Sequence, residues 1–417
     1  MNDELFERSN AEAAAVRGTN QTGMRVQNER LVLSLVRQNG SLAKSDLARM
    51  TGLSAQTVSV IMRALEGEGL LLRGEPVRGK IGQPSVPMRL NPDGVYFLGL
   101  KIGRRSADLT LIDFLGQVRA SERHIYRYPT VAGLVAFVTD AYARVMATLP
   151  PDSRGRLASL GVAMPFRMWE WVQAIGAPTA AMEEWRDSDL QAALEGLIGV
   201  PVLIQNDASS ACGAELFFGK GDRPKNFLYF YFGTFIGGGL VMGGQLFLGA
   251  TGNAAGVGSM PVPGPAGELR SLIATASLQT LADAMAAEGE NPDHIWQQAE
   301  EWHVSPAVLD RWLDEAATGL AWASLSAAAL LELDAVMIDG WMPAAVRAAM
   351  VARVAAALER LDSAGVEVPQ VREGTIGAYA RSLGAAAIPL SQSYLAGTTA
   401  PPADAAGRGP ATGRLRV

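Results

Sequence analysis

The sequence predicts an α/β protein in which a small helical module precedes a larger two-lobed body. The chain has 417 residues and 48% of them are hydrophobic, which is more than one hydrophobic core usually holds. Its charge is uneven. Residues 25–90 carry ten Lys and Arg against five Asp and Glu, a net +5, which leaves −11 on the rest of a chain whose total is −6. Between about 91 and 390, strand-like runs alternate with helix-like runs, as in α/β domains.

These shifts in composition divide the chain into four segments. Residues 1–24 are polar and rich in Ala, so we expect a flexible arm. The basic module occupies 25–90, the body 91–390, and a segment rich in Pro, Ala and Gly at 391–417 is expected to be a disordered tail.

Several classes of protein are excluded at this stage. The single cysteine, Cys212, rules out a disulfide scaffold and a Cys-rich zinc site, and we expect no metal and no cofactor. The first residues are acidic and lack an apolar stretch, and the most apolar run, 320–331, is too short to span a bilayer. The sequence therefore predicts a cytoplasmic protein without membrane contact.

The basic module is predicted to contain three helices. Leu31 and Leu35 stand four residues apart in a helix over 25–38, and a short helix over 44–50 follows. A tight turn containing Gly52 leads to Ser54, which suits the N-cap of the third helix. This order is typical of a helix-turn-helix. The third helix places an apolar face at Val58, Ile61, Met62 and Leu65, and Gly69 suits its C-terminal cap.

The opposite face of the third helix carries side chains of the kind that read DNA. Gln bonds adenine edges, Ser and Thr reach bases or phosphates, and Arg reaches guanine or phosphate. The Arg- and Lys-containing segment after the third helix predicts a wing that touches phosphates or the minor groove. A helical hairpin used for dimer packing, or merely a solvated basic surface, is the alternative. We expect double-stranded operator DNA to contact Lys44, Ser54, Gln56, Thr57, Ser59, Arg63, Arg78, Lys80 and Gln83.

The body contains one strand pattern twice. Strand-like runs at 96–101 and 107–113 precede a Gly116 turn and a third strand. A second instance begins at 227–232, continues through the glycine-rich run 233–239, and returns after Gly243 and Gly244. A repeat of this kind predicts two lobes with a cleft between them. Seven short motifs mark the module and the body: 51–54, 57–59, 82–84, 90–92, Asn206-Asp207-Ala208, 233–239, and 252–256 with Asn253.

The order and spacing of these motifs over about 25–390 resemble the ROK (repressor, open reading frame, kinase) family of transcriptional regulators. The resemblance implies a winged helix-turn-helix followed by a two-lobed, actin-like ATPase (ROK) domain. In the family's kinases this domain phosphorylates sugars, and in its regulators it senses a sugar or a sugar phosphate.

The chain departs from the family's kinases in both phosphate loops. The first loop of the kinases opens with Asp and continues with small residues, whereas this chain has Lys101, Arg104 and Arg105. Bulky side chains block the approach of backbone N–H groups to phosphate. In the second loop, 233–239, Phe235 stands where the family usually has Gly; a buried strand turn with close glycine packing is the alternative explanation of this loop.

The resemblance also locates a sugar site and shows what it has lost. Asp207 matches the kinase base and Asn206 would hold a sugar hydroxyl, although either residue also suits a helix N-cap. Val257 and Met260 replace the family's Glu and His, and a Pro-rich segment at 261–265 replaces its zinc segment. We expect no catalytic residue, with Asp207 an inactive equivalent of the base. The expected effector site consists of Asn206, Asp207, Gly233, Thr234 and Asn253.

Together these features predict a transcriptional regulator, a repressor in carbohydrate metabolism rather than an enzyme. It would act as a homodimer or tetramer, because two-fold operators match two-fold proteins. One alternative is an active ATP-dependent sugar kinase with an appended DNA-binding head. Another is a regulator whose ROK domain binds a non-sugar ligand, with Arg104 and Arg105 attracting an anion, or only dimerises.

Overall fold

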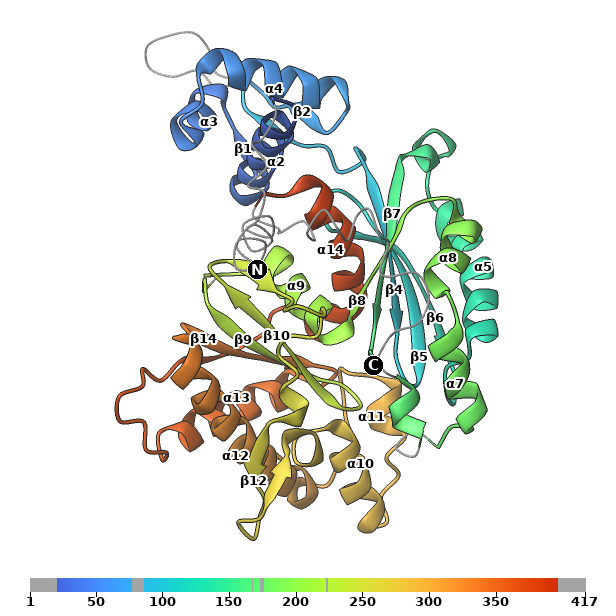
Figure 1. Ribbon diagram of the computed structural model, residues 1–417, viewed down its shortest axis with the longest axis vertical. Helices are drawn as coiled ribbons and strands as arrows, with labels where there is room; N and C mark the ends of the chain where they lie inside the picture. The colour runs from blue at the N-terminus through green and yellow to red at the C-terminus, as the bar shows by residue number, and fades with distance from the viewer. Residues whose placement is uncertain (1–20, 77–85, 167, 173–175, 223, 397–417) are drawn as a thin grey trace, which may run out of the picture. The chain divides into compact units, whose positions relative to one another are not determined.

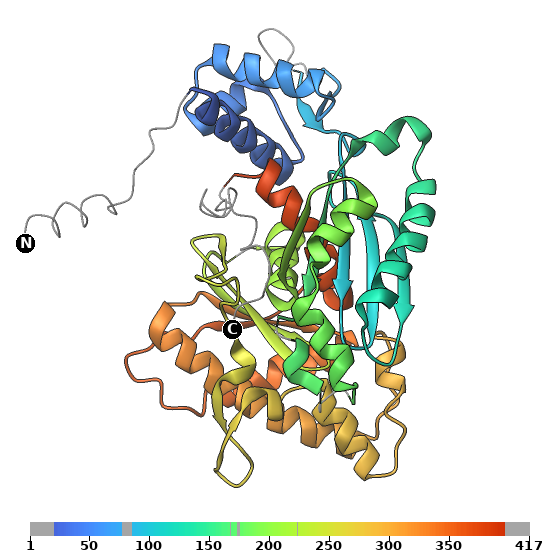
Figure 2. The ribbon, with the colours of Figure 1, turned by 45° about the vertical axis from the view of Figure 1, so that its right-hand side comes forward.

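The computed structural model describes residues 21–76, 86–166, 168–172, 176–222 and 224–396 (Figures 1 and 2). The chain divides into two compact units. One consists of Met1–Leu90 with Tyr394–Ala396, and is called the head below; the other consists of Asn91–Ser393 with Gly397–Val417, and is called the body.

The head is a three-helix module with a small antiparallel sheet of order β1-β3-β2. Its helices form where the apolar spacing predicts them, and Val36, Leu47 and Met62 are buried at their centre. The turn between the second and third helices needs Gly52, whose φ of 70° is left-handed. The elements are α2 (Gln21–Asn39), β1 (Ser41–Leu42), α3 (Lys44–Thr51), α4 (Ala55–Gly67), β2 (Leu71–Arg73) and β3 (Met88–Leu90).

The last residue of the body's final helix and the two residues after it belong to the head. Helix α14 (Ala380–Tyr394) continues past the boundary at residue 390 that the composition suggests, so the tail predicted for 391–417 begins too early. Leu395 is only 5% exposed, and the backbone N–H of Ala396 donates to Ser34 Oγ at 2.8 Å. Burial of an apolar side chain and a hydrogen bond order these residues despite the Pro- and Ala-rich sequence that follows. The other residues of the predicted arm and tail, apart from 21–24, lie outside the described residues.

The first lobe of the body is a five-stranded sheet of order β6-β5-β4-β7-β8. The strands β4, β5 and β6 pair antiparallel, while β7 and β8 extend the sheet in parallel. Helices α5 and α8 cover one face, with α7 beside them (Figure 1). The elements are β4 (Tyr96–Ile102), β5 (Ser106–Ile112), β6 (Val118–Ile125), α5 (Val131–Ala147), β7 (Leu157–Met164), α7 (Thr179–Asp187), α8 (Leu190–Ile198) and β8 (Val202–Asn206).

The second lobe repeats this topology, as the sequence predicts. Its sheet has the order β11-β10-β9-β14-β15, again with three antiparallel strands and two parallel ones. The second strand begins at Ile236 rather than Gly233, because the carbonyls of Gly233 and Thr234 accept hydrogen bonds from the start of α10. The elements are α9 (Asp207–Phe218), β9 (Phe227–Phe232), β10 (Ile236–Met242), β11 (Gln245–Phe247), β12 (Pro261–Pro263), β13 (Leu269–Ser271), α10 (Leu278–Ala287), α11 (His294–Gln297), α12 (Pro306–Leu331), β14 (Ala335–Gly340), α13 (Ala344–Leu358) and β15 (Gln370–Glu373).

Helices α9 and α14 pack between the two sheets of the body. Glycines in the strands make this possible: a Cβ at Gly161 would collide with Ala385 of α14, and one at Gly239 would collide with Cys212 of α9. The two helices also touch each other where Gly384 lies against the backbone of Ser210. None of the helices in the described parts of the chain is both long and apolar enough to cross a membrane.

Replacing Gly384 by Val is expected to destabilise the body by about 2 kcal/mol or more, because overpacking a tight contact costs about 1–3 kcal/mol and here the obstacle is backbone. A Cβ at this position would meet the carbonyl of Ser210. Urea unfolding would measure the loss. The matched control is Gly196→Val in α8, where a Cβ meets nothing within 4 Å; an equal loss in both variants would show that helix propensity rather than packing is responsible.

Candidate functional site

The outer face of α4 in the head carries most of the predicted DNA-reading side chains that the structure describes. Gln56 and Arg63 are exposed and Ser59 is partly exposed, while the apolar residues of the opposite face are buried. Lys44, at the start of α3, is exposed as well. The helix therefore presents polar groups suited to base edges, and one cation suited to phosphate or guanine.

Ser54 and Thr57 have a structural role at the start of α4. Ser54 Oγ accepts a hydrogen bond from the backbone N–H of Thr57 at 3.1 Å, and the two hydroxyl oxygens lie 2.8 Å apart. The predicted N-cap at Ser54 is confirmed. The wing residues Arg78, Lys80 and Gln83 lie outside the described residues.

Val60 is a residue of this face that the sequence prediction missed. It is 52% exposed on α4, four residues after Gln56 and three before Arg63, so the three side chains share one helical stripe. Its spacing from Gln56 would have been the signal. An apolar side chain in this position suits the methyl group of thymine.

Three of the five predicted effector residues of the body meet where β8 ends and α9 begins. Asn206 caps α9, since its Oδ1 accepts from the backbone N–H groups of Ala208 at 3.0 Å and Ser209 at 3.2 Å. Its Nδ2 donates to Asn253 Oδ1 at 3.3 Å. The structure thus brings Asn206, Asp207 and Asn253 together, and the capping alternative is confirmed for Asn206.

Asp207 is held by an arginine that the sequence prediction missed. The Arg381 guanidinium donates to Asp207 Oδ2 at 3.0 Å, and the two side chains are only 14% and 13% exposed. Arg381 also lies over the ring of Tyr231 at 4.9 Å, and its Nη1 lies 3.3 Å from where a Cβ at Gly233 would stand. The signal was a lone cation in the otherwise apolar and small-residue start of α14, because a buried charge needs a partner.

The start of the first phosphate loop is occupied by an internal ion pair. Lys101, buried on β4, donates through Nζ to Ser106 Oγ at 2.7 Å and to Asp108 Oδ2 at 2.9 Å. Burial lowers the pKa of Lys101 to about 8; the positive charges of Arg381 and Arg123 lower it further, and Asp108 opposes the shift.

The two departures from the kinase pattern contact each other. The Arg104 guanidinium of the first loop lies 4.2 Å from the centre of the Phe235 ring of the second. Burial lowers the pKa of Arg104 to about 10, although nearby Asp207 opposes the shift. Side chains therefore fill the space between these two loops.

Two further arginines of the first lobe lie over tryptophans of the second. Arg105 is 4.9 Å from the ring of Trp296, and Arg123 is 4.5 Å from that of Trp341. With the Arg104 stack, three planar cations of one lobe rest on three aromatic rings of the other. These contacts connect the two lobes.

The remaining glycines of the second loop serve packing. A Cβ at Gly237 would lie 2.7 Å from Ala208, and one at Gly238 would lie 2.7 Å from Val257. Val257, where the family's kinases have Glu, is buried against this strand. The predicted alternative of close glycine packing is thus confirmed for these positions, while Gly233 faces Arg381.

The segment that stands in place of the family's zinc site is a β-hairpin. Strand β12 pairs with β13, and Val262 between two prolines is buried. Within the described ranges, no three His, Cys, Asp or Glu side chains gather as metal ligands would.

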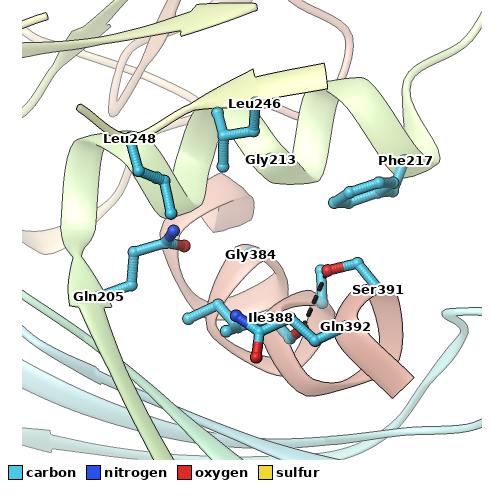
Figure 3. A pocket seen from close by; sticks show the side chains of 10 residues that line it. Gln205, Gly213, Phe217, Leu246, Leu248, Gly384, Ile388, Ser391 and Gln392 are labelled. Carbon is cyan, nitrogen blue, oxygen red and sulfur yellow. Dashed lines mark hydrogen bonds between the residues drawn. The ribbon is translucent and has the colours of Figure 1, made fainter. Parts of the chain in front are cut away.

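A small cavity of about 40 Å³ lies elsewhere in the body, between α9, β11 and α14 (Figure 3). Leucines 246 and 248 and the Phe217 ring face Ile388 across it, and Gln205 and Gln392 supply amide groups. A space this size holds about one water molecule. Its lining is completed by Gly213, Gly384, Ala387 and Ser391.

The titration of Lys101 predicts that stability rises with pH above about 8. Because its folded-state pKa of about 8 lies below the usual 10.5, the unfolded chain holds this proton more tightly. The free energy of unfolding should rise between these values, by up to about 3 kcal/mol. Urea unfolding at pH 7.5 and pH 10 would compare the protein with Lys101→Met. The stability difference should move in favour of the unaltered protein at pH 10, and a constant difference would contradict the prediction.

Fold and site together define a two-part protein, a winged helix-turn-helix joined to a two-lobed ATPase-like body. The model of the ROK family matches residues 97–391, and a model described as winged helix-turn-helix DNA-binding matches residues 27–71. The chain belongs to the ROK family. The predicted resemblance and the predicted fold class are both confirmed.

Comparable proteins carry regulator names. The xylose repressor of Bacillus spizizenii is 24% identical over 242 residues, which are 58% of this chain and 62% of that protein. The DNA-binding transcriptional dual regulator NagC of Escherichia coli is 24% identical over 262 residues, 63% of each. The chain therefore spans less than two thirds of the length of these relatives. A crystal structure of a ROK family transcriptional regulator, a homologue of the E. coli MLC protein, has a TM-score of 0.66 at 19% identity and covers 89% of this chain and 96% of that one.

Proposed function

We propose that the protein is a DNA-binding transcriptional repressor whose ROK body senses a small metabolite, a sugar or a sugar derivative, and does not phosphorylate it. The observation that carries this proposal is the ion pair between Asp207 and Arg381 in a body that follows a winged helix-turn-helix. A general base must reach the hydroxyl proton that it removes. Here the Arg381 guanidinium donates a hydrogen bond to one carboxylate oxygen of Asp207, the residue that matches the kinase base.

The phosphate loops support the same conclusion. A phosphate loop binds through backbone N–H groups that small residues leave accessible. In this chain Lys101 forms an ion pair with Asp108 at the start of the first loop, and Arg104 rests on Phe235 of the second. A kinase needs this space for the transferred phosphoryl group and its metal ions.

The head supplies the DNA-binding part of the proposal. We place α4 in the major groove, with Gln56 and Arg63 on base edges and Val60 against a thymine methyl group. Lys44, Ser54, Thr57, Ser59, Arg78, Lys80 and Gln83 complete the contacts with bases and phosphates. The names of the xylose repressor and of NagC support this role.

The regulatory cycle follows from the two parts. The effector site is Asn206, Asp207, Gly233, Thr234 and Asn253, and a ligand there changes DNA affinity only if it binds one state of the body better than the other. The protein works in the cytoplasm as a homodimer or tetramer on a two-fold operator of genes for carbohydrate use.

Two assays test the proposal on the same preparation. Selection of duplexes from a random pool should enrich one sequence with two-fold symmetry. ATP, Mg²⁺ and a panel of hexoses and pentoses should give no sugar phosphate above the background of Asp207→Asn. Sugar phosphorylation that Asp207→Asn abolishes would establish the kinase instead, and a pool without enrichment would remove the DNA-binding role.

A further inference from the structure

A second cluster of charges lies between the lobes, beside Asp207 of the predicted effector site. It is a small pocket of about 10 Å³, lined by Lys101 and Asp108 of the first sheet, by Arg123 of β6, by Trp341 and Tyr379 of the second lobe, and by Arg381 of α14. Three of these six side chains are cations and one is an acid. We call it the Lys101–Arg381 pocket.

The carboxylates of the pocket do not balance its cations. Asp108 is shared, since one oxygen lies 2.9 Å from Lys101 Nζ and the other 3.3 Å from Arg123 Nε. Arg381 forms an ion pair with Asp207, at 3.0 Å. Three cations thus share two carboxylates, and Arg104 adds a fourth positive charge close to Asp207. The cluster carries a net positive charge. The side chains of Lys101 and Arg381 are only 7% and 14% exposed, and uncompensated charge is costly in such places, whereas the Arg123 side chain is 33% exposed.

One donor in the pocket has no protein acceptor. Arg381 Nε is buried and makes no hydrogen bond to any of the residues that the structure describes. Buried N–H groups of this kind are nearly always satisfied, by protein, water or ligand. The low pKa of Lys101 agrees with an excess of positive charge, because Arg381 and Arg123 are among its causes.

The two arginines are also held in position. The Arg123 guanidinium lies 4.5 Å from the centre of the Trp341 ring and that of Arg381 lies 4.9 Å from the centre of the Tyr231 ring, so cation–π contacts help to hold both groups in place. A fixed planar guanidinium matches the oxygens of a carboxylate or a phosphate. They come from β6 of the first lobe and from α14, the helix that packs between the two sheets, so a ligand between them would connect these elements.

We propose that the Lys101–Arg381 pocket binds the oxyanion of the effector, a carboxylate or phosphate group, through Lys101, Arg123 and Arg381. The proposal rests on the proposed function, since it gives the chemical class of the metabolite that the body senses. It adds a binding group outside the residues Asn206, Asp207 and Asn253. The effector is then an acidic or phosphorylated metabolite rather than a neutral sugar.

Calorimetric titration of the full chain tests this inference. The probes are inorganic phosphate, glucose 6-phosphate and D-gluconate, with D-glucose as the neutral probe and NaCl at matched ionic strength. At least one anionic probe should bind, and Arg123→Gln should weaken that binding about ten- to a hundredfold, as expected for loss of a charged hydrogen bond. Comparing the affinities for the two phosphate probes and for D-gluconate shows whether the pocket prefers a phosphate or a carboxylate group.

The matched control is Arg144→Gln, which removes the same charge from the same lobe at an exposed pair with Glu122. It should leave anion affinity unchanged. Arg123→Lys keeps the charge but not the planar fork, so its anion affinity should lie between those of Arg123→Gln and Arg144→Gln. This variant also keeps the test usable if Arg123→Gln fails to fold.

The outcomes separate this inference from the proposed function. If D-glucose binds and no anion does, the body is a neutral sugar sensor and the pocket proposal is wrong. If anions bind equally well to Arg123→Gln and Arg144→Gln, they bind elsewhere and the proposal is again wrong. If no probe binds, the proposal for this pocket falls while duplex selection still decides whether the head binds DNA.

Discussion

Replacing Gln56 and Arg63 together by Ala should abolish specific operator binding while leaving the head folded. Both side chains are exposed on α4, opposite its buried face, so their loss removes no core packing. A good contact with a base edge contributes about 1–3 kcal/mol, so the double variant should bind at least about thirtyfold more weakly. Fluorescence anisotropy with the selected duplex would measure this.

The matched control for this variant exchanges the same two residue types on another helix. Arg25 and Gln27 are exposed on α2, and replacing both by Ala removes equal charge and size from the head. Specific affinity should fall far less in the control. Equal losses in the two double variants would mean that charge alone matters and that α4 does not read the sequence.

Replacing Arg381 by Met should destabilise the body by about 3–5 kcal/mol, because it leaves the Asp207 carboxylate buried without its partner. The Asp207–Arg381 pair is nearly buried, with the partners 13% and 14% exposed. Urea unfolding would measure the loss. In a double variant, Asp207→Asn with Arg381→Met, the buried charge is gone and much of the lost stability should return.

The comparison for this prediction is Arg144→Met, which breaks the exposed pair with Glu122 and should cost about 0–1 kcal/mol. A small loss in Arg381→Met would mean that water or another group supports Asp207 in its place. The carboxylate would then be free to act as a base, and the case against the kinase would weaken.

Local patterns in the sequence were enough to predict the helices of the head and the antiparallel hairpins that begin each lobe of the body. The spacing of Val58, Ile61, Met62 and Leu65 located the buried face of α4, and Ser54 located its start. The runs at 96–101 and 227–232 and the turns after them predicted the repeated hairpins, because each hairpin joins neighbours in the chain.

The chemistry of the candidate site required contacts that no local pattern contains. Asp207 and Arg381 are 174 residues apart. The substitutions at Arg104 and Phe235 were visible as separate departures, but only the fold shows that one side chain rests on the other. The end of α14 was missed for the same reason, since Tyr394–Ala396 belong to the head and Leu395 is buried.

The most direct measurement is the affinity of the full chain for its selected duplex, by fluorescence anisotropy, with and without each member of a panel of sugars, sugar acids and sugar phosphates. We expect specific binding at physiological salt, and a change in affinity of about tenfold or more with one ligand class and none with Mg-ATP, within the usual range of coupling between sites. Binding no tighter than to random duplex, or a response to Mg-ATP alone, would contradict it.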